Sequence, residues 1–351
     1  MKFKYVLLGG IAAISMFPMQ ALAGKVLSFT TSSTPSAPQS PILEAWAKKI
    51  DAGTNGDVKI EFYYQQSLSK LGDNLDAISS GLADMGLVVP AYSRQKLPLN
   101  YLSSTSTGTG DPYAILNAWS ATRENFPAIA AEDKANGMHF LASHSIGSVL
   151  FVGDKAYNSP DDLDGATMRL SSHYAYATKA GKWNVNPARI RSPETYTSLE
   201  KGTITGATTY TGQIYQFKLN EVADNVTVLN LGQHMNVYYM NLDTWGDLST
   251  EEQAVFNGAA RQLMEDLAQV EIEYAAEVLE SVEKEATYPM KITYLSDAER
   301  SVWSENLKKS YLNNVANATK VSADAPEIGE FYLNQIDAQA AEIKSGGYPW
   351  N

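Results

Sequence analysis

The feature that most constrains the fold is a long helical segment in the second half of the chain. Between Ser249 and Glu285 there is no proline and one glycine, and apolar residues recur every three or four positions. This spacing predicts a single amphipathic helix over about 248–286. At 1.5 Å per residue, about 35 residues extend over about 50 Å, which is longer than one small domain is wide. The segment therefore predicts a helix that crosses two lobes.

Before this helix, strand and helix patterns alternate. The expected strands are 25–30, 58–63, 83–89, 138–143, 148–153, 166–170, 204–207, 226–231 and 235–241. The expected helices in the first part are 42–52 and 73–80, and two more follow near 296–320 and 326–344. Such alternation is typical of an α/β protein with parallel strands. We therefore expect two α/β units tied together by the long helix.

The first 23 residues resemble an export signal. Lys2 and Lys4 precede an apolar run over 6–17, and Ala21 and Ala23 supply the small residues that a signal peptidase requires. An apolar run of about 12 residues is too short to span a bilayer, which takes about 20. The chain has no cysteine for lipid attachment. We predict cleavage after Ala23 and a soluble periplasmic protein with no membrane insertion after cleavage.

Composition excludes several kinds of chemistry. The chain has no Cys and four His in separate segments, so thiol catalysis and common zinc motifs are not expected. A net charge of -12 argues against a nucleic-acid partner. We interpret Asp161 and Asp162 as helix-capping residues rather than an acid–base pair. No nucleophile elbow or phosphate loop is present. We therefore expect no enzyme activity, metal or cofactor.

Aromatic residues and one buried arginine point to ligand binding instead. The chain has 20 Tyr and 6 Trp, and Tyr suits a closing ligand cleft because it joins an apolar ring to a hydroxyl. Arg169 lies in 166–170, which otherwise reads as a buried strand. Its guanidinium must have partners, either an internal ion pair or the carboxylate of a ligand. The spacing alone leaves both open.

Several segments carry a family resemblance through their order and spacing. They are 46–50, 54–60, 68–72, 80–86, 162–169 and 193–206, followed by Asn241, Trp245 and Leu248. Across the whole mature chain they resemble the solute-binding proteins of tripartite ATP-independent periplasmic (TRAP) transporters, the dicarboxylate-binding-protein-like family. The resemblance implies a two-lobed periplasmic-binding-protein-like fold of type II, with hinge strands and a lobe-spanning helix. It implies lobe I over 24–146 and 235–270, and lobe II over 147–234 and 271–351.

The resemblance also implies a function. Such a protein captures a small organic acid by cleft closure and delivers it to the TRAP membrane permease subunits. The position of Arg169 is that of an arginine that holds the ligand carboxylate in the family. The remaining positions that we expect to line the ligand site are Ser32, Ser33, Asp73, Asn74, Tyr92, His173, Arg191, Ser192, Thr209, Tyr210 and Gln213.

The chain departs from the family pattern at two places. Some members have a second ligand arginine where this chain has 147–149, and an amide is usual where it has Thr209. A dicarboxylate or sialic acid is therefore disfavoured, unless Arg189 or Arg191 substitutes. We expect a monocarboxylate or a hydroxy or sugar acid.

Three alternatives remain at this point. The same fold could bind a small amine, with Arg169 paired internally. A secreted enzyme with an aromatic cleft would need two carboxylates about 5 to 9 Å apart. A binding protein that docks on a sensor would use the same cleft. We expect a monomer, and we interpret the acidic outer face of the long helix as solvated, with a partner surface as the alternative.

Overall fold

The computed structural model describes residues 1, 24–105 and 107–350. The predicted signal peptide and its cleavage site after Ala23 lie outside the described residues. None of the helices in the part of the chain that is described combines the length and hydropathy needed to cross a membrane.

The strands form one mixed sheet in the order β2-β1-β3-β8-β4-β7-β5-β6, with β9 paired to β8. Their bounds are β1 Lys25–Thr30, β2 Val58–Tyr63, β3 Met85–Val88, β4 Met138–Gly153, β5 Thr167–Arg169, β6 Asn186–Ala188, β7 Gly206–Tyr210, β8 Asn225–Asn241 and β9 Lys291–Tyr294. β1, β2 and β3 are parallel to one another, as are β5, β6 and β7. The carboxyl ends of these two parallel sets border the site described below.

Two long antiparallel strands join the two halves of the sheet. β4 and β8 pair along nearly their whole length, with register shifts near Ser145 and Ser148. The expectation of four separate short strands over 138–153 and 226–241 was wrong. Gly147 and Gly232, both with positive φ, lie where the pairing is irregular, and the strands continue past them. These two strands are the hinge strands of the fold.

The five helices that the sequence predicts are present, and the described part of the chain has six more between the second and the third of them. Their bounds are α1 Gln39–Gly53, α2 Asn74–Ser79, α3 Pro112–Asn125, α4 Pro127–Ala135, α5 Ser172–Gly181, α6 Thr195–Glu200, α7 Gln213–Gln216, α8 Leu242–Gly246, α9 Thr250–Lys284, α10 Asp297–Ala318 and α11 Ala325–Gly346. The long helix α9 begins at a capping box, in which the Glu252 amide donates to Ser249 Oγ (3.1 Å) and the Ser249 amide donates to Glu252 Oε2 (2.6 Å).

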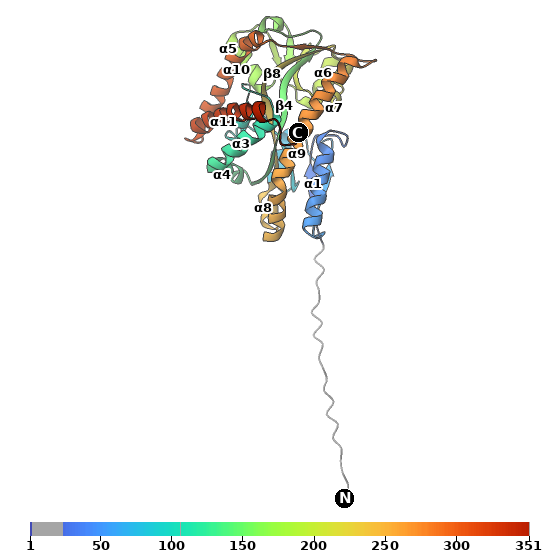
Figure 1. Cartoon of the computed structure of the whole chain (residues 1–351), viewed down its shortest axis with the longest axis vertical. Coiled ribbons are helices and arrows are strands. Elements are labelled where there is room, and N and C mark those ends of the chain that lie inside the picture. The colour runs from blue at the N-terminus through green and yellow to red at the C-terminus, as the bar shows by residue number, and fades with distance from the viewer. Residues whose placement is uncertain (2–23, 106, 351) are drawn as a thin grey trace.

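Helix α9 contributes to two separate hydrophobic clusters. Phe256, Leu263 and Leu267 in its first half pack with β1, β3 and α1. Val278 and Val282 in its second half pack in the other cluster. In Figure 1, the helix runs from the end of the molecule that holds α1 and α8 to the end that holds α6 and α7. The predicted lobe-spanning helix is confirmed.

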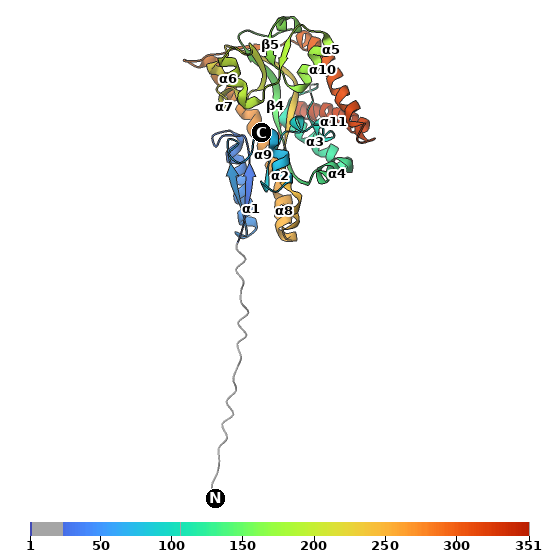
Figure 2. The ribbon, with the colours of Figure 1, turned by 180° about the vertical axis from the view of Figure 1, so that it is seen from behind.

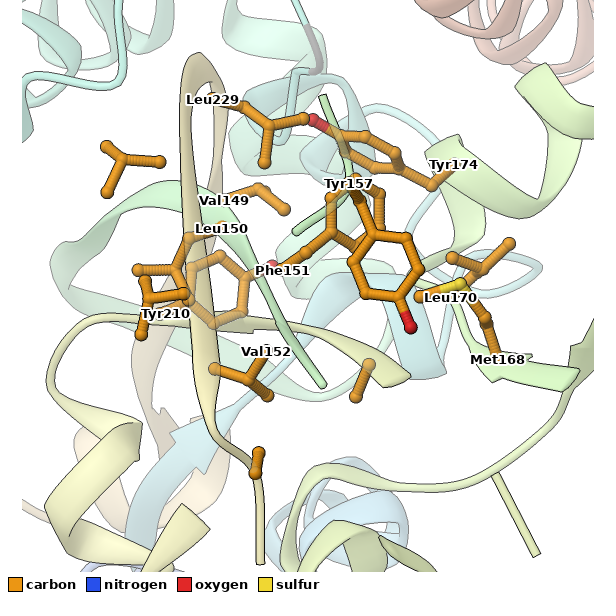
Figure 3. Packing of buried hydrophobic residues seen from close by; sticks show 14 of the residues in the cluster. Val149, Leu150, Phe151, Val152, Tyr157, Met168, Leu170, Tyr174, Tyr210 and Leu229 are labelled. Carbon is orange, nitrogen blue, oxygen red and sulfur yellow. The ribbon is translucent and has the colours of Figure 1, made fainter. Parts of the chain in front are cut away.

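The cluster at the far end of α9 is the core of one lobe. Phe151 on β4 lies among Tyr157, Tyr174 and the neighbouring apolar side chains of the same strand (Figure 3). The C-terminal helix α11 packs instead against α3, with Tyr332 against Trp119, their ring centroids 5.1 Å apart, and Figure 2 shows these helices side by side. The exact lobe bounds stay a prediction.

Candidate functional site

A cleft of about 980 Å³ lies between the two lobes. One wall follows the carboxyl ends of β1 and β3, where Ser32, Ser33 and Tyr92 line it. The other wall follows the carboxyl ends of β5, β6 and β7. The hinge strands close the back of the cleft with Ile146 and His234. Carboxyl ends of parallel strands are where α/β folds usually place their ligands.

Arg169 ends β5 and lines the cleft, although its exposed fraction is only 6%. Its Nε donates to the Ile190 carbonyl at 3.2 Å and its Nη2 donates to Ser192 Oγ at 2.7 Å. Its Nη1 donates to the Thr208 carbonyl. These three bonds hold the guanidinium plane from neighbouring strands and loops of one lobe. The side chain is therefore positioned before any ligand arrives.

In the described part of the chain, the same guanidinium has no acidic partner. Among the described residues, no Asp or Glu oxygen forms a salt bridge with Arg169. A guanidinium has five N–H donors, and the three bonds above leave one on each terminal nitrogen. A buried charge without a counter-charge is costly. The arrangement favours a ligand carboxylate over the internal ion pair.

Arg191 connects the two walls of the cleft. It precedes the short 3₁₀ helix Ser192–Glu194 in one lobe, and its guanidinium lies over Gly72 in the other. A Cβ built on Gly72 would lie 2.5 Å from both Cζ and Nη2 of Arg191. Only a residue without a side chain allows this close approach. The contact is suited to hold the lobes together.

Replacing Gly72 with alanine should weaken ligand binding more than folding. The new methyl group would displace the flexible end of Arg191, so the free energy of unfolding should change by less than about 0.5 kcal/mol. Ligand affinity should fall by about 3- to 10-fold if the contact supports closure. Calorimetric titration of Gly72→Ala, Arg191→Ala and the double variant tests this. If the double variant loses as much binding free energy as the two single variants together, the contact between Gly72 and Arg191 does not support ligand binding.

Other predicted site residues lie on the lining. Of the twelve, the cleft brings together Ser32, Ser33, Tyr92, Arg169, Arg191, Ser192, Tyr210 and Gln213. Gln39 Nε2, also on the lining, donates to Ser33 Oγ at 2.7 Å. Burial raises the pKa of Tyr210, which therefore offers the ligand a neutral hydroxyl.

Four predicted residues do not line the cleft. Thr209 is buried behind it and donates to Gln213 Oε1 at 3.0 Å. His173 turns toward Tyr101, with ring centroids 5.4 Å apart. Asn74 is buried and donates to the Leu87 carbonyl at 2.7 Å. Asp73 is exposed on the outside of the turn, where it is one residue away from the lining residue Gly72.

The sequence reasoning missed several polar lining residues. The clearest are His234 and Asn236 on β8, together with Arg94 and Glu271. A signal for the first two was present, because polar residues inside an otherwise apolar strand are unusual, as for Arg169. No periodic signal marked Glu271, since it is one of many acidic residues on α9.

His234 is a neutral group at the back of the cleft. Burial, followed by the nearby His173 and Arg169, lowers the pKa of His234 to about 3. Its ring lies 5.9 Å from that of Tyr210, centroid to centroid. His234 therefore offers a ligand one hydrogen-bond donor or acceptor without a charge at neutral pH.

The cleft lining is basic although the protein is acidic. It includes Arg94, Lys96, Arg169, Lys179, Arg189 and Arg191 as basic residues, and Asp76 and Glu271 as acidic ones. Asp76 is paired with Lys96. Such a local excess of positive charge attracts anions toward the cleft. Within the described residues, no group of three or more His, Asp or Glu side chains is placed to hold a metal ion.

Comparisons with known sequences identify the family of the chain. The model of the family "Bacterial extracellular solute-binding protein, family 7" (DctP) matches residues 29–317. The C4-dicarboxylate-binding periplasmic protein DctP of Rhodobacter capsulatus is 23% identical over 313 residues, which cover 86% of this chain and 90% of that protein. The ectoine-binding periplasmic protein TeaA of Halomonas elongata is 22% identical over 302 residues, 82% of this chain and 80% of TeaA.

Solved structures share the fold. A TRAP periplasmic solute-binding protein from Bordetella bronchiseptica, with bound (R)- and (S)-mandelate, superposes with a TM-score of 0.77 at 20% identity and covers 90% of this chain and 99% of its own. A marine metagenome TRAP solute-binding protein specific for pyroglutamate superposes with a TM-score of 0.75 at 19% identity. The match covers 89% of this chain and 99% of that protein. These relatives are transport proteins rather than enzymes. The chain therefore belongs to family 7 of the bacterial extracellular solute-binding proteins, the DctP family of periplasmic TRAP transporter components.

Proposed function

We propose that this protein captures a small organic acid in the periplasm by cleft closure and delivers it to the membrane subunits of a TRAP permease. The ligand is a monocarboxylate or a hydroxy or sugar acid. The protein performs no chemical step and acts as a monomer. The single observation that carries the proposal is Arg169, which is buried at the cleft with no acidic partner among the described residues.

The basic lining supports an acid over a simple amine. A free amine would enter a cleft with six basic and two acidic lining residues, and it would leave the guanidinium of Arg169 unpaired. Two of the solved neighbours were crystallised with mandelate and with pyroglutamate, which are small carboxylates. The negative net charge of the whole chain concerns long-range attraction and not the pocket itself.

Closure follows from where the polar groups lie. Arg169 and Ser192 belong to one wall, while Ser33 and Gln39 belong to the other. A ligand that contacts both walls binds the closed form better than the open form. It shifts the population toward closure by no more than that difference in affinity.

A thermal-shift screen of the mature protein, residues 24–351, tests the ligand class. Monocarboxylates, hydroxy acids, uronates and amines are added after copurified ligand has been removed. An acid present at about a thousand times its Kd should stabilise the protein by about 4 kcal/mol. Small-angle scattering should show a smaller radius of gyration with the same acid. If amines stabilise the protein and acids do not, the proposed ligand class is wrong.

A further inference from the structure

Glu271 is a buried carboxylate at the hinge side of the cleft. It lies near the middle of α9, and its exposed fraction is 7%. It lines both the ligand cleft and a second cavity of about 420 Å³ on the far side of Gly212 and Ile146. A Cβ built on Gly212 would lie 3.7 Å from Glu271 Oε2. The carboxylate is therefore near the backbone that follows β7, the strand beside Arg169.

Two hinge-strand residues hold this carboxylate in place. His144 Nε2 on β4 lies 2.9 Å from Glu271 Oε1, and His144 Nδ1 lies 3.1 Å from the hydroxyl of Tyr238 on β8. Tyr238 is buried, and among the described residues His144 is the partner that its hydroxyl has. The hydroxyl therefore donates to Nδ1, and Nε2–H donates to the carboxylate. His144 therefore holds Glu271 through Oε1.

One carboxylate oxygen of Glu271 has no partner among the described residues. Among the described residues, no Lys or Arg forms a salt bridge with Glu271, and Oε2 accepts no hydrogen bond. Arg169, on the same cleft, is a buried cation without an acidic partner. Burying a charged group without a partner costs free energy, and the cost is paid twice when two such groups of opposite sign lie in one cleft without pairing. A ligand that carries both opposite charges would satisfy both.

We propose that Glu271 is a specificity-determining residue that selects acids carrying a cationic or N–H donor nitrogen in addition to the carboxylate. The inference rests on the proposed function and names its ligand class more narrowly. The carboxylate of the ligand binds Arg169, and its nitrogen donates to Glu271 Oε2. His144, itself in contact with Tyr238, keeps the acceptor in place through Oε1 and leaves Oε2 to the ligand. A plain acid leaves Glu271 unsatisfied and binds more weakly.

Matched pairs of ligands test this selectivity. The pairs are L-proline and cyclopentanecarboxylate, L-pipecolate and cyclohexanecarboxylate, and phenylglycine and phenylacetate, which differ in the nitrogen and little in shape. Calorimetry on the wild type should show at least about tenfold tighter binding of the nitrogen-bearing member in the pair that fits the cleft. Glu271→Gln should reduce this preference to less than about threefold, while the affinity for the nitrogen-free acid changes little.

Two further variants control the experiment. Glu277→Gln removes the same charge from an exposed position on the same helix and should leave the preference unchanged. Glu271→Asp keeps the charge and should retain most of the preference, which also provides a result if Glu271→Gln folds poorly by circular dichroism. Equal binding within every pair, or a preference that survives Glu271→Gln, overturns the inference while the organic-acid function stands. If no carboxylate of either kind binds, the proposed function itself fails and the inference with it.

Discussion

Replacing Arg169 with alanine should reduce the affinity for the organic-acid ligand by about 30-fold to several thousandfold. The guanidinium is buried and already oriented by Ile190, Ser192 and Thr208, so the ligand carboxylate gains two charge-assisted bonds at little cost in ordering. Truncating one partner of a buried, hydrogen-bonded charge pair costs about 2–5 kcal/mol. The measurement is a calorimetric titration with the acid that gives the largest thermal shift.

The control for this variant is a lysine at the same position. Arg169→Lys keeps the positive charge but loses the planar fork, so it should bind the acid more tightly than the alanine variant and more weakly than the wild type. Both variants also lose hydrogen bonds to the Ile190 and Thr208 carbonyls, and their folding must be verified by circular dichroism before titration. An alanine variant that folds and binds the acid as the wild type does would show that Arg169 is structural.

Replacing Trp303 with alanine should have the largest effect on stability. Trp303 on α10 is fully buried in the core of the second lobe. Its ring centroid lies 5.4 Å from that of Phe151 and 5.2 Å from that of Trp183, and its Nε1 donates to the Asn158 carbonyl at 3.0 Å. Removing a buried tryptophan leaves a large cavity and costs about 3–5 kcal/mol, and it also leaves that carbonyl without its partner.

Urea unfolding of the mature protein measures this loss. The free energy of unfolding of a protein is usually about 5–15 kcal/mol. The urea concentration at the midpoint of unfolding should therefore fall by a large fraction in the Trp303→Ala variant. Val302→Ala is the matched control, since Val302 is the neighbouring residue and its exposed fraction is 54%. It should change the free energy by less than about 0.5 kcal/mol. A Trp303→Ala variant no less stable than this control would contradict the packing described here.

The sequence predicted the elements that carry a local pattern. The bounds of helix α9 were predicted to within about two residues. Apolar residues repeat every three or four positions along it, and among regular secondary structures only a helix has this period. Arg169 stood out because a charge inside an apolar strand needs a partner wherever that strand is packed. Most of the lining residues on the loops after β1, β6 and β7 were placed through the family resemblance.

Other predictions failed because the deciding interactions are not local. Four short strands were expected over 138–153 and 226–241, but the pairing of β4 with β8 continues past Gly147 and Gly232. His173 was expected to face the ligand, but its ring lies against that of Tyr101 in a tilted arrangement instead. A residue's own neighbours in sequence do not determine which side of a packed helix meets the cleft.

The sequence by itself determined the long helix and marked Arg169 as a charge inside an apolar strand, because each follows from spacing within one segment. The alternation of strand and helix patterns along the chain predicted the class of fold. Only the tertiary structure decided which charges remain unbalanced. Glu271 is one acidic residue among many on α9, and it becomes distinctive through His144, 127 positions away in the chain. Burial and pairing across such separations depend on packing, and packing has no signature in the local order of residues.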